Sequence, residues 1–419
     1  MESLNLKDVN RAARKGDIEI FKKCISQKIF PDKYNVGKAS ARGHLEIVKI
    51  AADHKIFPKK YWLSRTCEDG HIEILKLLAS YNVFPDYNGP DYASKNGHLN
   101  ILKFLASHKV LPTSTGLIFA AENGKIEVLD FFISIGIHPD TATANYSCYG
   151  GQLEFLKRLV GMKIFPDYGI DWAIEKGHLD IVKYLHSIGI KLKLNDKSYN
   201  KAVGNNHLNM VAYLIETFPK YVFMFDSNFA IENGHLEMLK LLAKHKCFPA
   251  KNLNYSQMAL DTACLKGYFE LLQWIYQEYK ILPTQEGMNK AIQWSYLHIL
   301  NWGADNGLLP TKEGIYCGFS TGNSETAKWL IEKGLSIDQC GVNYAAEYQD
   351  VEILKLLAQK KIFPDSVGVA QAARAKKIEN VKFCLSNGIM PDHDWIEHIL
   401  KWEGYEEVIE LLTQNGYKF

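Results

Sequence analysis

The sequence predicts an all-α protein built as a repeat solenoid, and three observations lead to that prediction. A seven-residue phrase recurs, for example from Gly43 to Lys49 (GHLEIVK) and from Gly97 to Lys103 (GHLNILK). Successive copies lie close to 27 residues apart, as from Gly43 to Gly70 and from Gly70 to Gly97. Each interval carries two short apolar patterns of helical period and, in most copies, one proline. Units of this length stack into one continuous array, so 419 residues need not form several domains.

The glycine that opens the phrase, called here the register position, marks about fifteen copies. Later copies lose the letters of the phrase but keep its spacing, and the longest interval, 33 residues, separates Gly234 from Gly267. We therefore expect a single elongated, curved array over residues 1–419, with an irregular joint at about 190–265. The register positions are Gly16, Gly43, Gly70, Gly97, Gly124, Gly151, Gly177, Asn206, Gly234, Gly267, Ser295, Gly322, Gln349, Lys376 and Gly404.

The residues before each register position predict a first helix. A small residue lies four positions before it in almost every copy, as at Ala39, Ala93 and Ala120, and an apolar residue often lies seven before it, as at Val36 and Leu117. Positions three and four apart share one face of a helix, so these residues form one narrow stripe. Alanine in that stripe lets neighbouring helices approach closely. The first helices are therefore expected to stack on one another.

The residues after each register position predict a second helix. Apolar residues follow at offsets four, five and eight, as at Ile101, Leu102 and Leu105. Glutamate at offset three and lysine at offset six, as at Glu73 and Lys76, fall on the opposite face, where an i,i+3 ion pair suits solvent.

A proline then closes most units, fifteen residues after the register position, as at Pro58 and Pro112. Proline cannot continue a helix and restricts the residue before it to an extended conformation. Each copy thus reads as helix, tight turn, helix and a proline-pinned loop.

The composition is that of an ordinary soluble globular protein, with 47% apolar and 23% charged residues. Lys plus Arg number 49 against 47 Asp plus Glu, and this balance of +2 argues against a dedicated nucleic-acid surface. The eight cysteines include no C-x-x-C pair, which favours buried, reduced thiols and a cytoplasmic location. No signal-peptide core and no apolar run of ~20 residues is present, so no membrane contact is expected.

Taken together, the copies resemble ankyrin repeats. The segment from Thr115 to Gly124 (TGLIFAAENG) matches the family's T-P-L-H-x-A frame with Gly116 in place of proline, and a Gly-His turn and a Leu-Glu-Ile-Val helix occur in other copies. A 27-residue unit is six residues shorter than the family's, and the shortfall falls where ankyrin repeats build a projecting β-hairpin finger. Short, finger-poor units are similar to ankyrin-like proteins of protists and of the large DNA viruses that infect them. The resemblance implies a protein-binding solenoid, in the host cytoplasm if the protein is viral.

Residues that could carry chemistry are few. The histidines that follow the register positions, such as His44, His71 and His98, recur once per unit, and stacked helices lie ~8–10 Å apart. Zinc requires ligands ~2 Å from one ion, so these histidines are expected to be structural and to bond the turn. The sequence also lacks phosphate-binding and nucleophile-elbow motifs. We therefore expect no catalytic residues, no cofactor and no metal site.

The candidate binding site lies on the first helices, opposite the alanine stripe. Four consecutive units carry an aromatic residue five positions before the register position, and residues two positions before it flank them. The row is expected to form either an exposed partner-binding ridge or a half-buried filling between helices, and the choice stays open. The candidate site residues are Tyr92, Lys95, Phe119, Glu122, Tyr146, Tyr149, Trp172 and Glu175.

The expected function is a non-catalytic scaffold or adaptor, a monomer that binds another protein along the concave face lined by the first helices. This expectation draws on the ankyrin resemblance, and no nucleic acid is expected as a partner. One alternative is a nucleic-acid-binding solenoid in which Arg11, Lys38 and Arg65 contact phosphates on the same face. Two weaker alternatives are an enzyme with a site on the concave face and an array that associates with itself through an uncapped end.

Overall fold

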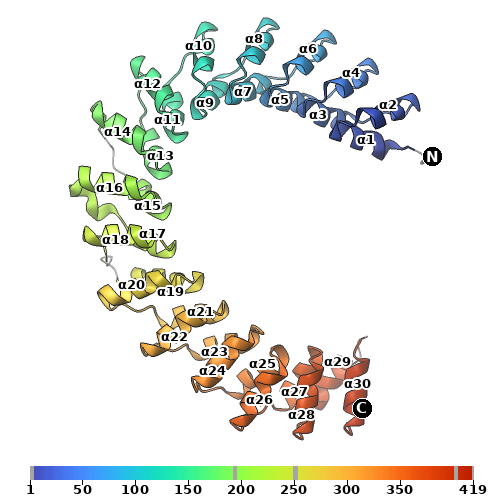
Figure 1. Cartoon of the computed structure of the whole chain (residues 1–419), viewed down its shortest axis with the longest axis vertical. Helices are drawn as coiled ribbons and strands as arrows, with labels where there is room; N and C mark the ends of the chain where they lie inside the picture. Colours follow the sequence, from blue (N-terminus) through green and yellow to red (C-terminus); the bar gives the residue numbers. More distant parts are fainter. Residues whose placement is uncertain (1–3, 192–195, 249–252, 401–403, 418–419) are drawn as a thin grey trace. The chain divides into compact units, whose positions relative to one another are not determined.

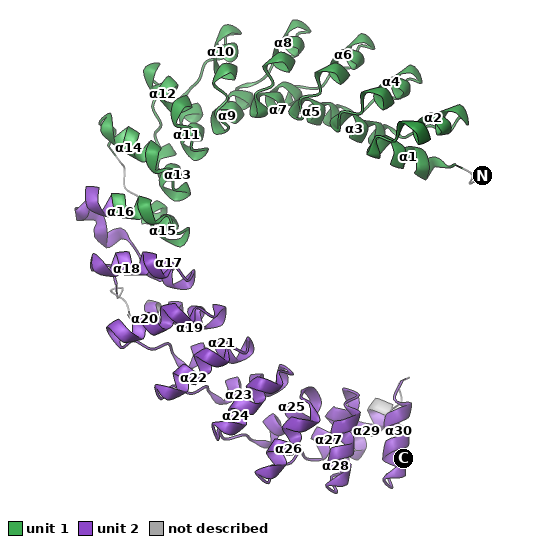
Figure 2. Cartoon of the chain, in the orientation of Figure 1, with its two compact units in different colours: residues 1–213 green, residues 214–419 purple. Residues whose placement is uncertain are grey.

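The computed structural model describes residues 4–191, 196–248, 253–400 and 404–417. Over these residues the chain is all-helical, with no β-strand, and consists of helix pairs that follow one another in chain order (Figure 1). The predicted all-α repeat solenoid is therefore confirmed. The chain divides into two compact units, Met1–Tyr213 and Leu214–Phe419, which Figure 2 shows in different colours. The division falls within the irregular joint anticipated at about 190–265, of which residues 192–195 and 249–252 lie outside the described parts.

In the first unit, the odd-numbered helices lie side by side on the concave side and the even-numbered helices lie on the convex side (Figure 1). The concave helices are α1 (Leu6–Lys15), α3 (Lys33–Ala41), α5 (Lys60–Glu68), α7 (Asn88–Asn96), α9 (Ser114–Glu122), α11 (Thr141–Tyr149), α13 (Gly169–Lys176) and α15 (Asp196–Gly204). The convex helices are α2 (Ile18–Ser26), α4 (Leu45–Asp53), α6 (Ile72–Ser80), α8 (Leu99–Ser107), α10 (Ile126–Ser134), α12 (Leu153–Gly161), α14 (Leu179–Ser187) and α16 (Leu208–Thr217), the last of which crosses the boundary between the units.

The second unit continues the pairs after one irregular stretch, the 3-10 helix η1 (Pro219–Met224). Its first helices are α17 (Asn228–Glu232), α19 (Leu253–Lys266), α21 (Gln285–Gln293), α23 (Lys312–Ser320), α25 (Gln339–Tyr348), α27 (Ser366–Arg374) and α29 (His393–Leu400). Its second helices are α18 (Leu236–Lys244), α20 (Phe269–Tyr279), α22 (Leu297–Asp305), α24 (Ser324–Glu332), α26 (Val351–Gln359), α28 (Ile378–Ser386) and α30 (Glu406–Gln414). The 14-residue α19 accounts for part of the 33-residue interval.

The core forms where the sequence pattern places it. Ala39, Ala93 and Ala120 are fully buried between neighbouring first helices, and α7 packs against both α5 and α9. Leu102 and Leu105 of α8 are fully buried as well. The opposite face of the second helices is solvated, with a salt bridge of 2.8 Å between Glu73 and Lys76, which suits the i,i+3 spacing. Small residues therefore set the spacing of the inner layer, and leucines and isoleucines fill the space between the layers.

The turn between the two helices explains why glycine recurs at the register position. Gly70 has φ +84°, in the left-handed region that a residue with a Cβ enters at a cost of ~1–2 kcal/mol. A Cβ there would also lie 2.6 Å from Cε1 of His98, the histidine of the next copy. Both the backbone conformation and the imidazole against the Cα atom favour glycine at position 70.

His98, His178 and His207 bond the turn of the preceding copy, as the sequence predicts. Nε2 of His98 lies 2.9 Å from the carbonyl oxygen of Glu68, and Nε2 of His178 lies 3.1 Å from that of Tyr149. In one copy a glutamine takes this place, and Nε2 of Gln152 donates to the carbonyl of Glu122 at 3.2 Å. The imidazole thus forms a hydrogen bond between adjacent copies of the repeat, and a glutamine amide can replace it in this role.

A second inter-unit bond, which we call the amide latch, lies six positions before the register position. Oδ1 of Asp91 accepts from the backbone N–H of Thr113 at 2.7 Å, and Oδ1 of Asn145 accepts from that of Asp167 at 3.0 Å. The same bond occurs at Asn10–Asp32, Asp261–Thr284, Asn289–Thr311 and Asn343–Asp365. Each latch satisfies a backbone donor in the loop just before the next unit's first helix, where that donor would otherwise lack a partner.

Most cysteines are buried and none is in a disulfide, but Cys340 on α25 is exposed, so the expectation of buried thiols is wrong for that residue. Its position, nine before the register position, faces away from the alanine stripe. None of the described helices is both long and apolar enough to cross a membrane.

Candidate functional site

The variable surface of the first unit is the concave face of its first helices. The side chains five positions before each register position, which we call the inner row, project from successive helices α1 to α15. The inner row is Arg11, Lys38, Arg65, Tyr92, Phe119, Tyr146, Trp172 and Lys201. It is basic in the first three copies, aromatic in the next four and basic again in the eighth.

The aromatic part of the inner row forms two groups. Tyr92 and Phe119 stack with ring centroids 6.0 Å apart and planes 5° from parallel. Tyr146 contacts Trp172 edge to face at 5.3 Å, and Tyr149 closes a triangle with both rings. All five rings are partly buried, so each packs against a neighbour and keeps part of its surface in solvent. The rings thus fill space between helices and remain partly exposed, and partner binding by them stays a prediction.

A second row on the same face was missed by the sequence reasoning. It lies nine positions before the register position, one helical turn from the inner row, and i and i+4 share a face. Tyr168 contacts Trp172 at 4.8 Å, and the ammonium of Lys38 lies 4.5 Å from the ring centre of Tyr34. Tyr34 and Tyr168 are 51% and 45% exposed. The recurrence of tyrosine at this offset was the available signal.

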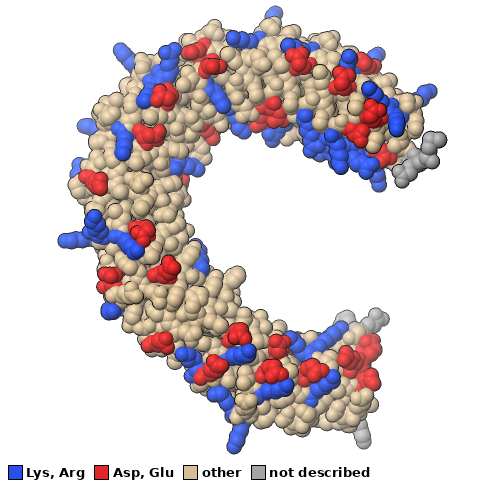
Figure 3. Space-filling model, in the orientation of Figure 1, with Lys and Arg blue, Asp and Glu red and all other residues tan. Residues whose placement is uncertain are grey.

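Positive charge gathers at the N-terminal end of this face. Figure 3 shows a cluster of Lys and Arg over α1 and α3 on the concave side. The basic residues of these two helices include Arg11, Arg14, Lys15, Lys33 and Lys38, of which Arg11 pairs with Asp8 at 3.2 Å. The convex face, by contrast, carries lysines in i,i+3 pairs with glutamates. The near-zero net charge therefore conceals a local separation of charge.

Two of the polar candidates, Lys95 and Glu175, form ion pairs with residues of adjacent copies of the repeat and do not project freely into solvent. Glu68, whose side chain is 8% exposed, accepts from Arg65 and from Lys95, with the Lys95 Nζ at 3.1 Å. Burial raises the pKa of Glu68, but the two cationic partners outweigh it, so this pKa lies below its usual value. Glu175 pairs with Lys201 of the next unit in the same way. The structure therefore joins Lys95 and Glu175 to ion pairs, while it places Glu122 at the concave surface, partly exposed.

Within the described ranges, no group of three or more His, Cys, Asp or Glu side chains is close enough to hold a metal ion. Burial lowers the pKa of the turn histidines His44 and His207 and so favours their neutral form. The unit-1 surface thus offers partly exposed aromatic rings and cationic side chains, which is the chemistry of a binding surface.

The fold and this surface define the chain as a helical-hairpin repeat solenoid with an aromatic and basic concave face. No family model and no curated relative matches it. Among solved structures it is similar to the pentatricopeptide repeat protein PPR10 from maize, at a TM-score of 0.32 and 15% identity, over 99% of this chain and 75% of that chain. A structure of PPR10 in complex with an 18-nucleotide psaJ RNA element matches at a TM-score of 0.27 and 13% identity, over 98% of this chain and 79% of that chain.

The assignment to the ankyrin family, including its protist and large-DNA-virus relatives, is wrong. The structures found to be similar are pentatricopeptide-repeat proteins, not ankyrin repeats. The physical reason lies in the repeat itself: the described part of the chain contains helix pairs and loops without a hairpin strand, and other helical-repeat families stack helix pairs in this way as well. The Gly-His turn and the alanine stripe are solutions to helix stacking and do not identify a family.

The expectation of a protein partner with nucleic acid excluded is also wrong. Two of the similar structures are complexes of PPR10 with an 18-nucleotide psaJ RNA element. The net charge of +2 is a poor guide here, because it averages the ion-paired convex face with the basic cluster over α1 and α3.

Proposed function

We propose that the chain is a non-catalytic nucleic-acid-binding scaffold that holds a single strand along the concave face of its first unit. The observation that carries the proposal is the inner row, in which partly exposed aromatic rings lie between two basic segments. Proteins that bind single strands combine a positive surface for the phosphates with aromatic rings on which bases stack.

The basic segments supply the phosphate contacts in this proposal. Arg11, Lys38 and Arg65 lie at equal offsets on α1, α3 and α5, so they recur at the spacing of the helices. Ion pairs with the buried Glu68 hold the side chains of Arg65 and Lys95 in place. Neutralising phosphates releases counterions, so binding should weaken steeply with salt.

The aromatic segment supplies stacking. Each ring of the inner row is supported by a neighbour, which fixes its orientation before a base arrives. Stacking contributes ~1–3 kcal/mol per base and tolerates any base, so little dependence on sequence is expected from these rings. A duplex hides its base faces, and we therefore expect single strands to bind more tightly than duplexes.

The test is the anisotropy of labelled single-stranded RNA and DNA with the full chain, against a duplex of the same sequence. Replacing Arg11, Lys38 and Arg65 together by Gln should lower the slope of log K against log salt by about 2, since each lost phosphate contact lowers it by ~0.7. The matched control replaces the convex lysines Lys49, Lys76 and Lys103 by Gln, which removes equal charge from the other face. Equal loss in both triple variants, or no binding at low salt, contradicts the proposal.

Tyr146→Ala and Trp172→Ala test the stacking part. Each should weaken single-strand binding by ~1–3 kcal/mol and leave the salt slope unchanged, because no phosphate contact is removed. A fall in melting temperature without a change in affinity would assign the rings to packing alone.

A further inference from the structure

A pocket in the second unit lies apart from this surface. It is a cavity of about 270 Å³ lined by Arg374 at the end of α27 and by Asp394, Trp395 and His398 of α29. Pockets for drug-sized ligands measure ~300–1,000 Å³, so this one suits a ligand at the small end of that range. Trp395 is 43% exposed, which makes its indole a ring face open to a ligand.

Hydrogen bonds with Glu347 and Tyr405 orient Arg374, the cationic residue of the pocket, before a ligand binds. Nη2 of Arg374 donates to Oε1 of Glu347, a carboxylate whose side chain is only 6% exposed, and the hydroxyl of Tyr405 donates to the Arg374 carbonyl at 3.0 Å. A guanidinium has five N–H donors, so the bond to Glu347 leaves others for a ligand. Glu347 raises the pKa of Arg374, so the group is cationic at any physiological pH.

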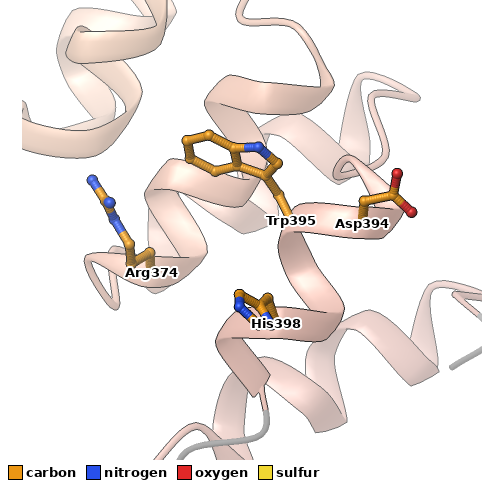
Figure 4. Close-up of a pocket in the computed structure, with 4 residues that line it drawn as sticks. All are labelled: Arg374, Asp394, Trp395 and His398. Atoms are coloured by element: carbon orange, nitrogen blue, oxygen red, sulfur yellow. The ribbon is translucent and has the colours of Figure 1, made fainter.

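The two basic side chains that line the pocket, Arg374 and His398, lie apart from its one carboxylate, Asp394. Figure 4 shows Arg374 to the left of Trp395 and His398 below it, while the carboxylate of Asp394 points away from both. A ligand stacked on the indole would thus carry its anionic group toward the guanidinium and the imidazole. Arginine forms paired hydrogen bonds with phosphate oxygens, and indole stacks on heteroaromatic bases.

We propose that this pocket binds one nucleotide, with the base on the indole of Trp395 and the phosphate at Arg374 and His398. The same chemistry is offered by a free nucleoside monophosphate and by the phosphorylated end of a strand. The site lies wholly in the second unit and does not rest on the function proposed for the first.

The test uses the full chain and ligand-observed saturation-transfer NMR with AMP and UMP, each against its nucleoside. Trp395→Ala should weaken nucleotide binding about 5- to 150-fold, the equivalent of one lost stacking contact. Trp395→Phe should retain most of it, and Trp294→Ala, which removes another exposed tryptophan of the same unit, should change nothing. Arg374→Lys should weaken the nucleotide and leave the nucleoside unaffected, because lysine lacks the paired donors.

A trinucleotide with and without a 5′-phosphate distinguishes the two sources. Preference for the phosphorylated trinucleotide over AMP supports a strand end, and equal or tighter binding of AMP supports a free nucleotide. Absence of binding by AMP, UMP and the trinucleotide at millimolar concentration, or undiminished binding by Trp395→Ala, overturns the proposal. These outcomes are independent of the unit-1 variants, so the two proposals can fail separately.

Discussion

The turns between the paired helices hold the same residue types from copy to copy, whereas the concave inner row holds different ones. At the turns, the glycine, the following imidazole and the carbonyl it bonds recur because each turn must receive the next unit. In the inner row, the same structural position holds Arg65, Tyr92, Phe119 and Lys201 in different copies without any change of fold. The repeated residues thus support the stack, whereas the variable ones are available for a ligand. Substitutions at both kinds of position test this contrast.

The largest effect is expected at a register glycine. Gly70→Ala should lower the free energy of unfolding by ~3 kcal/mol, because alanine must adopt a positive φ and its Cβ must displace the ring of His98. Gly136→Ala is the matched control, since Gly136 also has φ +84° but has nothing within 4 Å of the added Cβ. Urea denaturation of both variants measures the difference. If the two lose equal stability, the imidazole contact is unimportant and the turn requires glycine for its backbone alone.

The next effect is expected at the amide latch. Asp91 is 3% exposed and accepts from both the backbone N–H and the hydroxyl of Thr113, so Asp91→Ala should cost ~1–3 kcal/mol by leaving these donors unpaired. Asp91→Asn should cost less, because Asn145 makes the same backbone bond in another copy. Thermal unfolding of the two variants at neutral pH provides the measurement. Equal losses of stability would show that an amide oxygen at position 91 does not replace the carboxylate oxygen as the hydrogen-bond acceptor.

The latch also predicts a dependence on pH. Burial raises the pKa of Asp91 above its ordinary 3.8, more than its hydrogen bonds lower it. The folded state then binds the proton more tightly than the unfolded state, so the Asp91 contribution to stability falls as pH rises through the folded pKa and increases on acidification. The free energy of unfolding of Asp91→Asn and of the unmodified chain should be compared below pH 3.8 and above the folded pKa of Asp91. The variant should lack the part of the pH dependence that Asp91 contributes.

A smaller effect is expected at the imidazole. His98→Ala should lose ~1–2 kcal/mol, since the carbonyl of Glu68 loses its partner and the surface of Gly70 is uncovered. His98→Gln should recover much of that loss, because Gln152 already bonds the corresponding carbonyl. Melting temperatures of the two variants decide the matter, and a glutamine variant no better than alanine would show that the ring matters only by its shape.

The smallest effect on stability is expected in the inner row. Phe119→Ala removes one partly exposed ring and its stacking with Tyr92, which should cost ~0.5–1.5 kcal/mol. Single-strand binding should fall by a similar or greater amount if the proposed function holds. Measuring stability and affinity on the same variant tests the comparison directly: a loss as large as that of Gly70→Ala would place the inner row among the supports of the fold.

The sequence predicted the parts of the fold that depend on period. The spacing of Gly43, Gly70 and Gly97, the buried leucines of α8 and the Glu73–Lys76 pair all follow from helical geometry, and the structure contains them. The amide latch was missed because residues as different as Asn10 and Asp91 perform one task, which is visible only once the next unit's loop lies beside them.

The candidate site was less predictable for two physical reasons. Tyr146, Tyr149 and Trp172 do lie together, but whether a ring is exposed depends on how closely neighbouring helices approach, which no single helix pattern determines. The site of Arg374 and Trp395 joins residues from two adjacent copies of the repeat within the second unit, and the sequences of these copies are degenerate, so the repeat pattern gave no reason to pair them.

The amide latch has a consequence for how such a chain can change in length. Each latch joins residues only 22 or 23 positions apart, so no bond of this kind reaches beyond the adjacent unit. Excising one whole period, from one register position to the next, would bring a new acceptor opposite an equivalent loop donor and restore the bond. The array can therefore be shortened or extended by duplication and deletion, with the length of the concave surface adjusted in steps of one unit.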